Sequence, residues 1–497
     1  MIELYQSLKP GLIESIVLLK KSQRDSPELS TVVDTNHSGT SEEKRFKGEK
    51  KKVWIEAYGC SASMADYEMI AGLLKNCGYR LAKHESESSV NLIVTCSVKD
   101  VTEHKMLSRI TKLSKSPKPL IVAGCLPKAD QKKVEFINPT ASLLGPHSIN
   151  RTIEVVNSAI RGVRTIALQD SIADKINMPR SRLNPITSIV EIASGCMSNC
   201  SFCQTKLAKG MVRSYRTGDI IRQISTDIDQ GCKEIWLTST DNGCYGRDIG
   251  TDLVGLLDSC CQIEGEYKIR VGMMNPMYIP NMLDKLVKLY KHNSKIYKFL
   301  HIPVQSGCDR ILKKMKRGHT AEIFIETVKI FRKNIPEITI ATDIIVGFPT
   351  ETQKDFQQTM DLIRHTQPDI VNISRYSSRP GTAAAQLKKI NSQIVKGRSM
   401  QLHLLSEQIS KMRNLLWKGW RGEILIHKNN NNIFQGRNYA YKPIHIPLAY
   451  QFSSSSSSSS DLHIGMKANI EIIGFNNRAL IGRVINRPED SSIFLHK

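Results

Sequence analysis

Three cysteines with metal-binding spacing carry the clearest chemical signal in the chain. Cys196, Cys200 and Cys203 lie in the stretch GCMSNCSFCQTK, in the order C-x3-C-x2-C. A structural zinc site ordinarily takes four protein ligands, whereas three thiolates can hold three irons of a four-iron cluster. The spacing therefore predicts a 4Fe-4S cluster with one open iron, and a zinc site completed from elsewhere in the chain is the alternative.

An open iron accepts a ligand that chelates as an amino acid does, and S-adenosylmethionine is such a ligand. Phe202, between the last two cysteines, is expected to pack against this cofactor.

A second set of cysteines follows three predicted strands. Cys60, Cys96 and Cys125 end the stretches VWIEAYGC, VNLIVTC and PLIVAGC. Carboxyl ends of parallel strands meet at one edge of a sheet, so these thiols are expected to converge on a second cluster. The remaining cysteines lack such spacing and are predicted to be structural thiols: Cys77, Cys232, Cys244, Cys260, Cys261 and Cys308.

The elements that must position these cysteines alternate between strand and helix, which favours α/β domains with parallel sheets. Residues 51–150 form the first predicted domain and 151–185 a linker. Six further strand candidates between 186 and 418 suit a partial (β/α) barrel, whose site lies at the carboxyl ends of the strands.

After the partial barrel, the predicted elements change to one helix followed by short strands. Residues 393–416 are expected to form a helix with one apolar face, consisting of Leu402, Leu405, Ile409, Met412 and Leu416. Residues 419–497 show short alternating strands typical of a small OB-like β-barrel, with expected loop insertions at 429–432 and at Ser453–Ser460. Residues 1–50 are polar and are predicted to be a flexible extension.

The balance of charged residues indicates a class of partner. Lys and Arg outnumber Asp and Glu by 70 to 47 in 497 residues, which favours a polyanionic partner such as nucleic acid. Residues 388–421 are rich in basic side chains that can neutralise phosphate, and Trp417 and Trp420 can stack on unpaired bases. The alternative is a solvated helix face with tryptophans as hydrophobic anchors. The sequence shows neither a membrane span nor a secretory signal, so a reducing cytoplasm is expected, where cysteines seldom form disulfides.

Together these motifs resemble the methylthiotransferase family of radical S-adenosylmethionine enzymes. Members carry an N-terminal domain with three cysteines, a radical barrel and a C-terminal TRAM domain, and the match runs from about Val53 to Arg487. Five stretches resemble the branch that acts on N6-threonylcarbamoyladenosine in tRNA: CQTKLAKG, EIWLTSTDNGCYGRDIGTDL, FLHIPVQSG, ITIATDIIVGFPTET and RYSSRPGTAAA. Thr205 and Lys206 follow the radical cysteines in this branch, where other members more often carry proline. Ser63 departs from the family, which usually has Asn there.

The resemblance implies a reaction. The cluster on Cys196, Cys200 and Cys203 reduces S-adenosylmethionine, and the resulting 5′-deoxyadenosyl radical removes hydrogen from adenine C2. The second cluster supplies or carries sulfur, and a second S-adenosylmethionine supplies the methyl group. Asp241 is expected near the radical site. Other strand-end residues are expected to hold the cofactor: Ser239, Asn275, Gln305, Ser306, Asp343 and Gly347. The implied partners are the anticodon stem-loop of tRNA and a low-potential electron donor, with the chain acting as a monomer.

Two other functions remain open from the sequence. The same chemistry can act on another tRNA adenosine or on a ribosomal-protein side chain. A non-catalytic iron–sulfur or zinc protein that binds RNA is the alternative from a different class.

Overall fold

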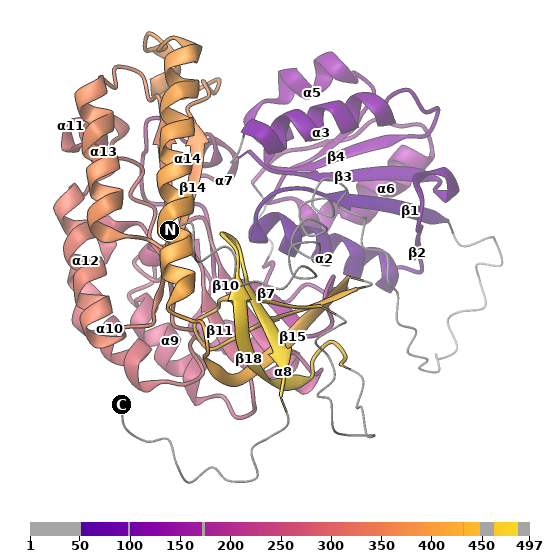
Figure 1. Cartoon of the computed structure of the whole chain (residues 1–497). Coiled ribbons are helices and arrows are strands. Elements are labelled where there is room, and N and C mark those ends of the chain that lie inside the picture. Colours follow the sequence, from indigo (N-terminus) through magenta and orange to yellow (C-terminus); the bar gives the residue numbers. More distant parts are fainter. Residues whose placement is uncertain (1–50, 98–99, 171–173, 431, 448–461, 486–497) are drawn as a thin grey trace.

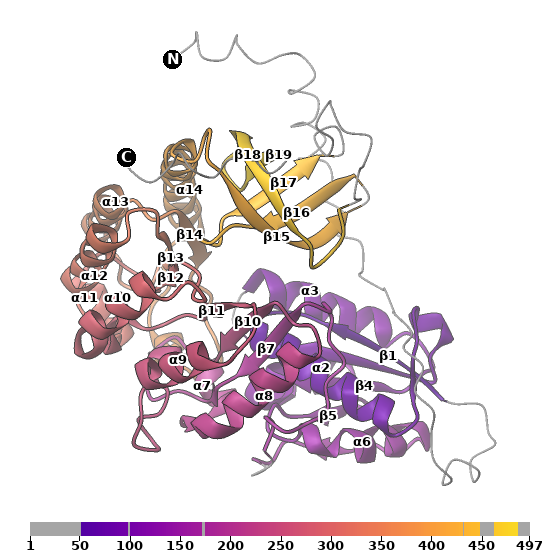
Figure 2. The ribbon, with the colours of Figure 1, turned by 90° about the horizontal axis from the view of Figure 1, so that it is seen from below.

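The computed structural model describes residues 51–97, 100–170, 174–430, 432–447 and 462–485 (Figures 1 and 2). The predicted flexible extension at 1–50 and the Ser453–Ser460 run lie outside these residues. Among the described helices, none combines the length and the apolar character needed to cross a bilayer.

The N-terminal domain is a parallel six-stranded sheet in the order β2-β1-β3-β4-β5-β6. Its strands are Lys52–Ala57 (β1), Arg80–Leu81 (β2), Val90–Thr95 (β3), Leu120–Gly124 (β4), Ser142–Leu144 (β5) and Ile166–Ala167 (β6). Strands β3 and β4 are buried along their whole length because helices cover both faces of the sheet. Helices α2 (Ser61–Asn76) and α6 (Thr152–Ile160) pack on one face. The other face carries α3 (Asp100–Leu113), α4 (Cys125–Ala129) and α5 (Gln131–Ile137).

This domain extends beyond the predicted boundary at residue 150. Helix α6 buries Val155 and Val156 against the sheet, and β6 pairs with β5 through Leu144 and Ala167. Strand β6 has little signature in the sequence, because two residues are too few to establish a strand pattern. The connection to the next domain therefore begins after β6 rather than at 151.

All six strands predicted for the second domain are present, in two parallel three-stranded sheets ordered β11-β10-β7 and β12-β13-β14. Their bounds are Thr187–Glu191 (β7), Glu234–Thr238 (β10), Lys268–Val271 (β11), Phe299–His301 (β12), Thr339–Val346 (β13) and Ile370–Arg375 (β14). A parallel bridge between Ile269 and Ile296 continues the first sheet toward the second. The helices outside the sheets are α8 (Thr217–Asp229), α9 (Leu253–Gln262), α10 (Leu283–His292), α11 (Asp309–Met315), α12 (Ala321–Asn334) and α13 (Gln353–Thr366). The arrangement is the expected partial barrel.

Helix α14 (Ser392–Leu415) runs along the outside of the partial barrel and leads into the C-terminal domain (Figure 1). Leu402 and Ile409 are buried, as the periodicity predicted, but Met412 and Leu416 are exposed. The apolar face is therefore shorter than expected, because the core contacts of α14 end before its last turn.

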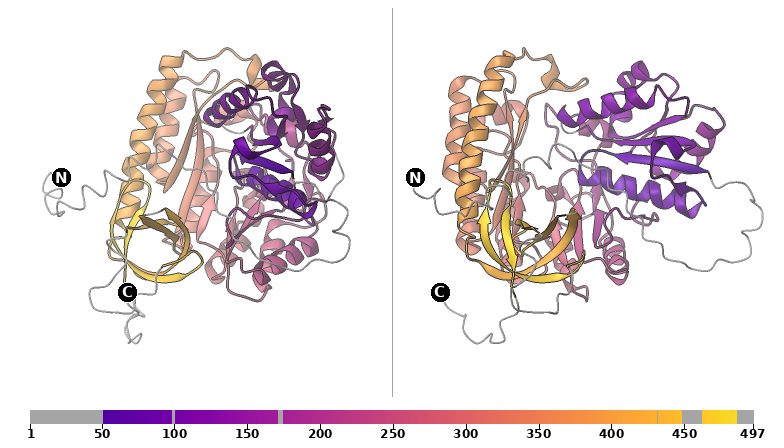
Figure 3. Two further views of the ribbon diagram at one scale, coloured as in Figure 1. Left: turned by 90° about the vertical axis from the view of Figure 1, so that its right-hand side faces the viewer. Right: turned by 45° about the vertical axis from the view of Figure 1, so that its right-hand side comes forward.

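The C-terminal domain is a closed five-stranded barrel in the order β15-β16-β17-β19-β18, seen end-on in the left panel of Figure 3. Its strands are Arg421–Asn430 (β15), Ile433–Arg437 (β16), Pro443–Pro447 (β17), Lys467–Phe475 (β18) and Leu480–Val484 (β19). Buried and partly exposed residues alternate along β18, as a small barrel requires. Asn429 and Asn430 belong to β15 and pair with Phe434 and Ile433, so the first two residues of the predicted loop at 429–432 are strand.

Candidate functional site

The first cysteine loop follows a short strand, β8 (Ala193–Ser194), and ends in helix α7 (Thr205–Lys209). Gly195 has φ of +76°, and a Cβ there would lie 1.9 Å from the carbonyl oxygen of Met211. Only glycine fits this turn. The ammonium group of Lys206 donates to the carbonyl of Cys196 and fastens the loop from the other side. The Thr-Lys pair singled out in the sequence thus helps to hold the cysteine loop in place.

Each thiol of the first triad has a polar neighbour. The backbone N–H of Ser198 donates to Cys196 Sγ over 3.3 Å, and Arg317 Nη1 donates to Cys200 Sγ over 3.3 Å. A hydrogen bond with Cys244 lowers the pKa of the Cys196 thiol to about 7. Burial raises the pKa of Cys203. Donors of this kind stabilise thiolates and tune the cluster that thiolates bind.

Cys244 and Arg317 are functional candidates that the sequence did not indicate. The donor atoms of Cys196, Asp241 and Cys244 all lie within 4.8 Å of one another. Cys244 was predicted to be a structural thiol because its neighbours in the sequence offer no metal spacing, yet the loop after β10 brings it against Cys196. Arg317 lies more than a hundred residues after Cys200, so no local pattern connects the two side chains.

Asp241 is fully enclosed and ties two strand-end loops together. Its Oδ1 accepts the backbone N–H groups of Gly243 and Asn275, each over 3.0 Å. Burial raises its pKa. The side chain of Asn275 in turn reaches Ser198 Oγ over 3.4 Å, beside Cys196. Asp241 and Asn275 therefore lie beside the first triad, whereas Ser239 bonds to Asn242 within its own loop.

The donor set suits an iron–sulfur cluster with a polar ligand beside it. Near the triad, buried atoms of Arg317 (Nε), Gln204 (Oε1) and Thr240 (Oγ1) have no hydrogen-bond partner among the described residues. Because an unpaired buried polar atom is costly, these atoms fit a site completed by a bound group. Phe202 packs against an apolar cluster that includes Ile311, Met315 and Phe348.

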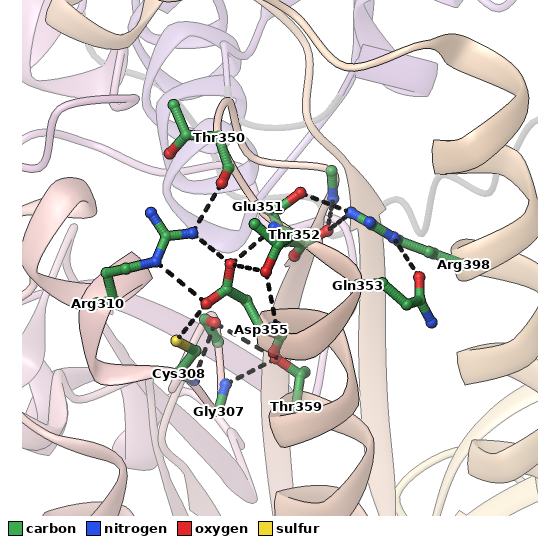
Figure 4. A network of polar contacts seen from close by, with 12 residues as sticks. Gly307, Cys308, Arg310, Thr350, Glu351, Thr352, Gln353, Asp355, Thr359 and Arg398 are labelled. Atoms are coloured by element: carbon green, nitrogen blue, oxygen red, sulfur yellow. Dashed lines mark hydrogen bonds and ion pairs between the residues drawn. The ribbon is translucent and has the colours of Figure 1, made fainter.

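The turn after β13 is held by a buried network, shown in Figure 4. Gly347 has φ of +76° and donates its N–H to Glu351 Oε2 over 2.9 Å. The same carboxylate accepts from Arg398 of α14 over 2.7 Å. Asp355 caps α13 in a capping box with Thr352 and pairs with Arg310. The Gly347 turn, expected to contact the cofactor, is therefore fixed from outside the barrel by α14.

The remaining predicted residues divide into two groups. Gln305 has φ of +75° and bridges to β13, where its N–H bonds to the carbonyl of Asp343 over 2.8 Å. The Asp343 carboxylate lies 3.2 Å from His301 Nε2 and accepts from Asn372 over 2.7 Å, so these three polar side chains meet on neighbouring strands. Ser306 points the other way, toward Thr359 of α13, and does not join them.

The second triad lies where the sequence placed it, at the carboxyl ends of adjacent strands. Cys60 is the N-cap of α2 after β1, Cys96 follows β3, and Cys125 begins α4 after β4. Pairing of Ala57 with Val94 and of Thr95 with Gly124 sets the three thiols side by side. The Cys96 side chain lowers the pKa of Cys60 to about 5, whereas burial raises that of Cys125 to about 12. Ser63 Oγ lies 3.7 Å from Cys60 Sγ, within reach of the sulfur.

The two triads belong to domains that pack against each other through α4 and α7. Helix α4 begins at Cys125 and packs against α7, which begins two residues after Cys203. Figure 1 shows α7 on the side of the partial barrel that faces the N-terminal domain.

The segment that leads into the C-terminal barrel offers exposed basic side chains rather than exposed aromatic rings. Trp417 is buried in the barrel core, and Trp420 and Tyr439 pack on it. The tryptophans are therefore anchors of the domain, and the stacking expected from the sequence has no support. Of the basic residues at 388–421, Arg398 and Arg413 form internal ion pairs. The exposed ones are Lys388, Lys389, Lys396, Lys411, Lys418 and Arg421.

Comparison with known proteins agrees with the sequence motifs. The model of the "Radical SAM superfamily" matches residues 190–363, and that of "Uncharacterized protein family UPF0004" matches residues 52–145. A "Probable threonylcarbamoyladenosine tRNA methylthiotransferase" of Pyrococcus horikoshii is 44% identical over 76% of this chain and 88% of its own length. The threonylcarbamoyladenosine tRNA methylthiotransferase of Homo sapiens is 34% identical over 80% of this chain and 69% of its own. That of Drosophila melanogaster is 32% identical over 88% and 79%.

These similarities span the N-terminal sheet and the partial barrel together, with both cysteine triads inside the matched domains. The resemblance inferred from the motifs is confirmed: the chain belongs to the threonylcarbamoyladenosine tRNA methylthiotransferase family.

Proposed function

We propose that this protein converts N6-threonylcarbamoyladenosine at position 37 of tRNA, beside the anticodon, to its 2-methylthio derivative. The observation that carries the proposal is the pair of three-cysteine sites, one in the loop between β8 and α7 and one at the carboxyl ends of β1, β3 and β4, in domains that pack together through α4 and α7. The non-catalytic alternative explains neither the two open triads nor the family relationship. The names of the relatives favour tRNA over a ribosomal protein.

Two 4Fe-4S clusters and S-adenosylmethionine supply the one-electron chemistry, the sulfur and the methyl group when bound. Cys196, Cys200 and Cys203 hold the first cluster, while Cys60, Cys96 and Cys125 hold the second. This chain's residues then position and shield the reacting groups, because the adenine C2–H bond is too inert for acid–base catalysis.

The residues around the first triad have separable roles. Arg317 donates to a ligand sulfur, and Asp241 fixes the two loops that close over Cys196. The Gly347 turn and the Asp343–His301–Asn372 group would line the site that holds S-adenosylmethionine. Cys244, buried beside Cys196, excludes water from that ligand.

The C-terminal barrel, as a TRAM-like domain, binds the anticodon stem-loop together with the exposed basic side chains between Lys388 and Arg421. The protein acts as a monomer in the cytoplasm with a low-potential electron donor. Replacing Lys388, Lys389 and Lys396 by glutamine weakens tRNA binding and flattens its salt dependence, because each lost phosphate contact lowers the slope by ~0.7–0.9. An unchanged slope would remove this surface from the proposal.

The decisive experiment uses anaerobically reconstituted full-length protein with reductant, S-adenosylmethionine and tRNA. Nucleosides from the digested tRNA are analysed by mass spectrometry, and 5′-deoxyadenosine is measured in parallel. We expect a methylthio gain on threonylcarbamoyladenosine, and none on tRNA that lacks the threonylcarbamoyl group or carries isopentenyladenosine instead. A gain on isopentenyladenosine alone would transfer the assignment to the other tRNA branch.

Two cysteine variants separate the roles of the triads. Cys200→Ala abolishes 5′-deoxyadenosine, whereas Cys96→Ala retains S-adenosylmethionine cleavage and loses the methylthio product. Cys77→Ala, at an exposed thiol after α2, is the matched control and keeps both activities. A Cys96→Ala variant that still made product would show that the second site is misassigned.

A further inference from the structure

Four buried charged side chains lie at the interface between the two domains that carry the cysteine sites. Lys175 Nζ lies 2.6 Å from Asp66 and 2.6 Å from Glu191, and Lys209 Nζ lies 2.8 Å from the other oxygen of Glu191. All four side chains are no more than 3% exposed.

The chain of charges crosses the domain interface. Asp66 lies on α2 of the N-terminal domain, Lys175 on the connecting segment, Glu191 at the end of β7, and Lys209 at the end of α7. A hydrogen bond between His147, which follows β5, and Ser194 Oγ over 3.0 Å crosses the same interface beside it. Because removing one partner from a buried ion pair is costly, such a network fixes the two domains in one relative position.

Lys209 differs from the other three members because it lies beside the second triad. Helix α7, which it ends, packs on α4, which Cys125 begins. Through Glu191 and Lys175, Lys209 is also linked to Asp66 on α2, the helix whose N-cap is Cys60. The pKa of Glu191 stays low, at about 2, because both lysines outweigh the effect of burial. Glu191 is therefore ionised and holds Lys209 in its charged form.

We propose that Lys209 is the charge-compensating residue of the second cluster. Its ammonium group, anchored by Glu191, offsets the negative charge of the Cys60–Cys96–Cys125 site. Because Lys209 belongs to the helix that follows the radical cysteines, it also links the position of the second cluster to that of the first. This inference rests on the proposed function, in which the second triad holds a cluster.

Charge compensation predicts the direction in which the reduction potential of the second cluster shifts. A cluster beside a positive charge is easier to reduce, because the added electron is stabilised. Lys209→Met removes one positive charge and is expected to shift the reduction potential of the second cluster to a more negative value. Glu191→Gln removes the negative partner and retains a hydrogen-bond acceptor for Lys209, so the potential is expected to shift in the opposite direction. A merely structural role predicts no such opposition of sign.

The experiment uses the full chain carrying Cys196→Ala, Cys200→Ala and Cys203→Ala, so that only the second cluster is loaded on anaerobic reconstitution. Iron and sulfide content, circular dichroism and an EPR-monitored reductive titration are recorded for this parent and for each variant made in it. Lys209→Arg keeps the charge and is expected to retain the parent potential. Lys132→Met, at an exposed lysine of α5, is the matched control and leaves the potential unchanged.

Each outcome decides the proposal. Opposite shifts for Lys209→Met and Glu191→Gln support it. So does a folded Lys209→Met protein that fails to load iron while Lys209→Arg loads normally. Shifts of the same sign, no shift at all, or loss of loading in both Lys209 variants overturns it and leaves the cluster assignment intact. A folded parent that holds no iron overturns the second-cluster assignment and this inference with it.

Discussion

Arg398 provides the sharpest test of how the Gly347 turn is held. Its guanidinium donates to the Glu351 carboxylate over 2.7 Å and to the Glu351 carbonyl over 3.0 Å, with the two side chains only 7% and 2% exposed. Arg398→Met leaves Glu351 buried without its cation. Breaking a buried pair in this way costs about 3–5 kcal/mol. We expect a loss of that size in the free energy of unfolding of the partial barrel.

The loss depends on pH. Burial raises the pKa of Glu351 even beside Arg398, so the folded state already favours the protonated acid relative to the unfolded chain. Without Arg398 the pKa rises further. The destabilisation is therefore complete above the raised folded pKa and shrinks as the pH falls through it, because a protonated Glu351 needs no cation.

Urea denaturation followed by circular dichroism measures the loss of unfolding free energy. Calorimetric titration of the reconstituted protein measures binding of S-adenosylmethionine. This binding should weaken in Arg398→Met, because the Gly347 turn is no longer fixed. Arg398→Met with Glu351→Gln removes both charges and should recover most of the stability. Lys396→Met, at an exposed lysine of the same helix, should change stability by no more than ~0.5 kcal/mol. A loss of less than ~1 kcal/mol in the single variant, or a double variant no more stable than the single one, would show that the Arg398–Glu351 pair does not hold the turn.

Three further predictions concern the cysteine sites. Gly195→Ala places a Cβ against the Met211 carbonyl in a left-handed turn that alone costs ~1–2 kcal/mol, so iron should be lost from the first site and kept by the second; equal iron content at both sites would contradict this. Arg317→Met removes a donor to Cys200, which should lower the potential of the first cluster and slow formation of 5′-deoxyadenosine, with Arg317→Lys intermediate; an unchanged EPR titration would exclude that role. The folded pKa of Glu191 is about 2 against an ordinary 4.5, so its contribution to stability is present above pH 4.5 and is lost as the pH falls toward 2; acid unfolding should be flatter in Glu191→Gln over that range.

The strands and both triads were predictable because their signals are local. Buried parallel strands such as β3 and β4 appear as apolar runs, and each cysteine of the second triad directly follows one. Parallel pairing then places strand ends together by geometry alone. Predictions failed where the signal was short or ambiguous: β6 has two residues, and Trp417 beside basic residues suits a base-stacking site as well as a barrel core.

Cysteine spacing after strands specifies three-thiolate sites, and the surrounding motifs specify the family, so the chemistry can be inferred from the sequence alone. What surrounds those sites depends on packing. Arg317 meets Cys200, Arg398 holds the Gly347 turn, and Glu191 anchors Lys209 through contacts between residues that are not neighbours in the chain. A ligand set needs spacing, which a sequence displays, whereas charge compensation needs proximity, which only packing creates.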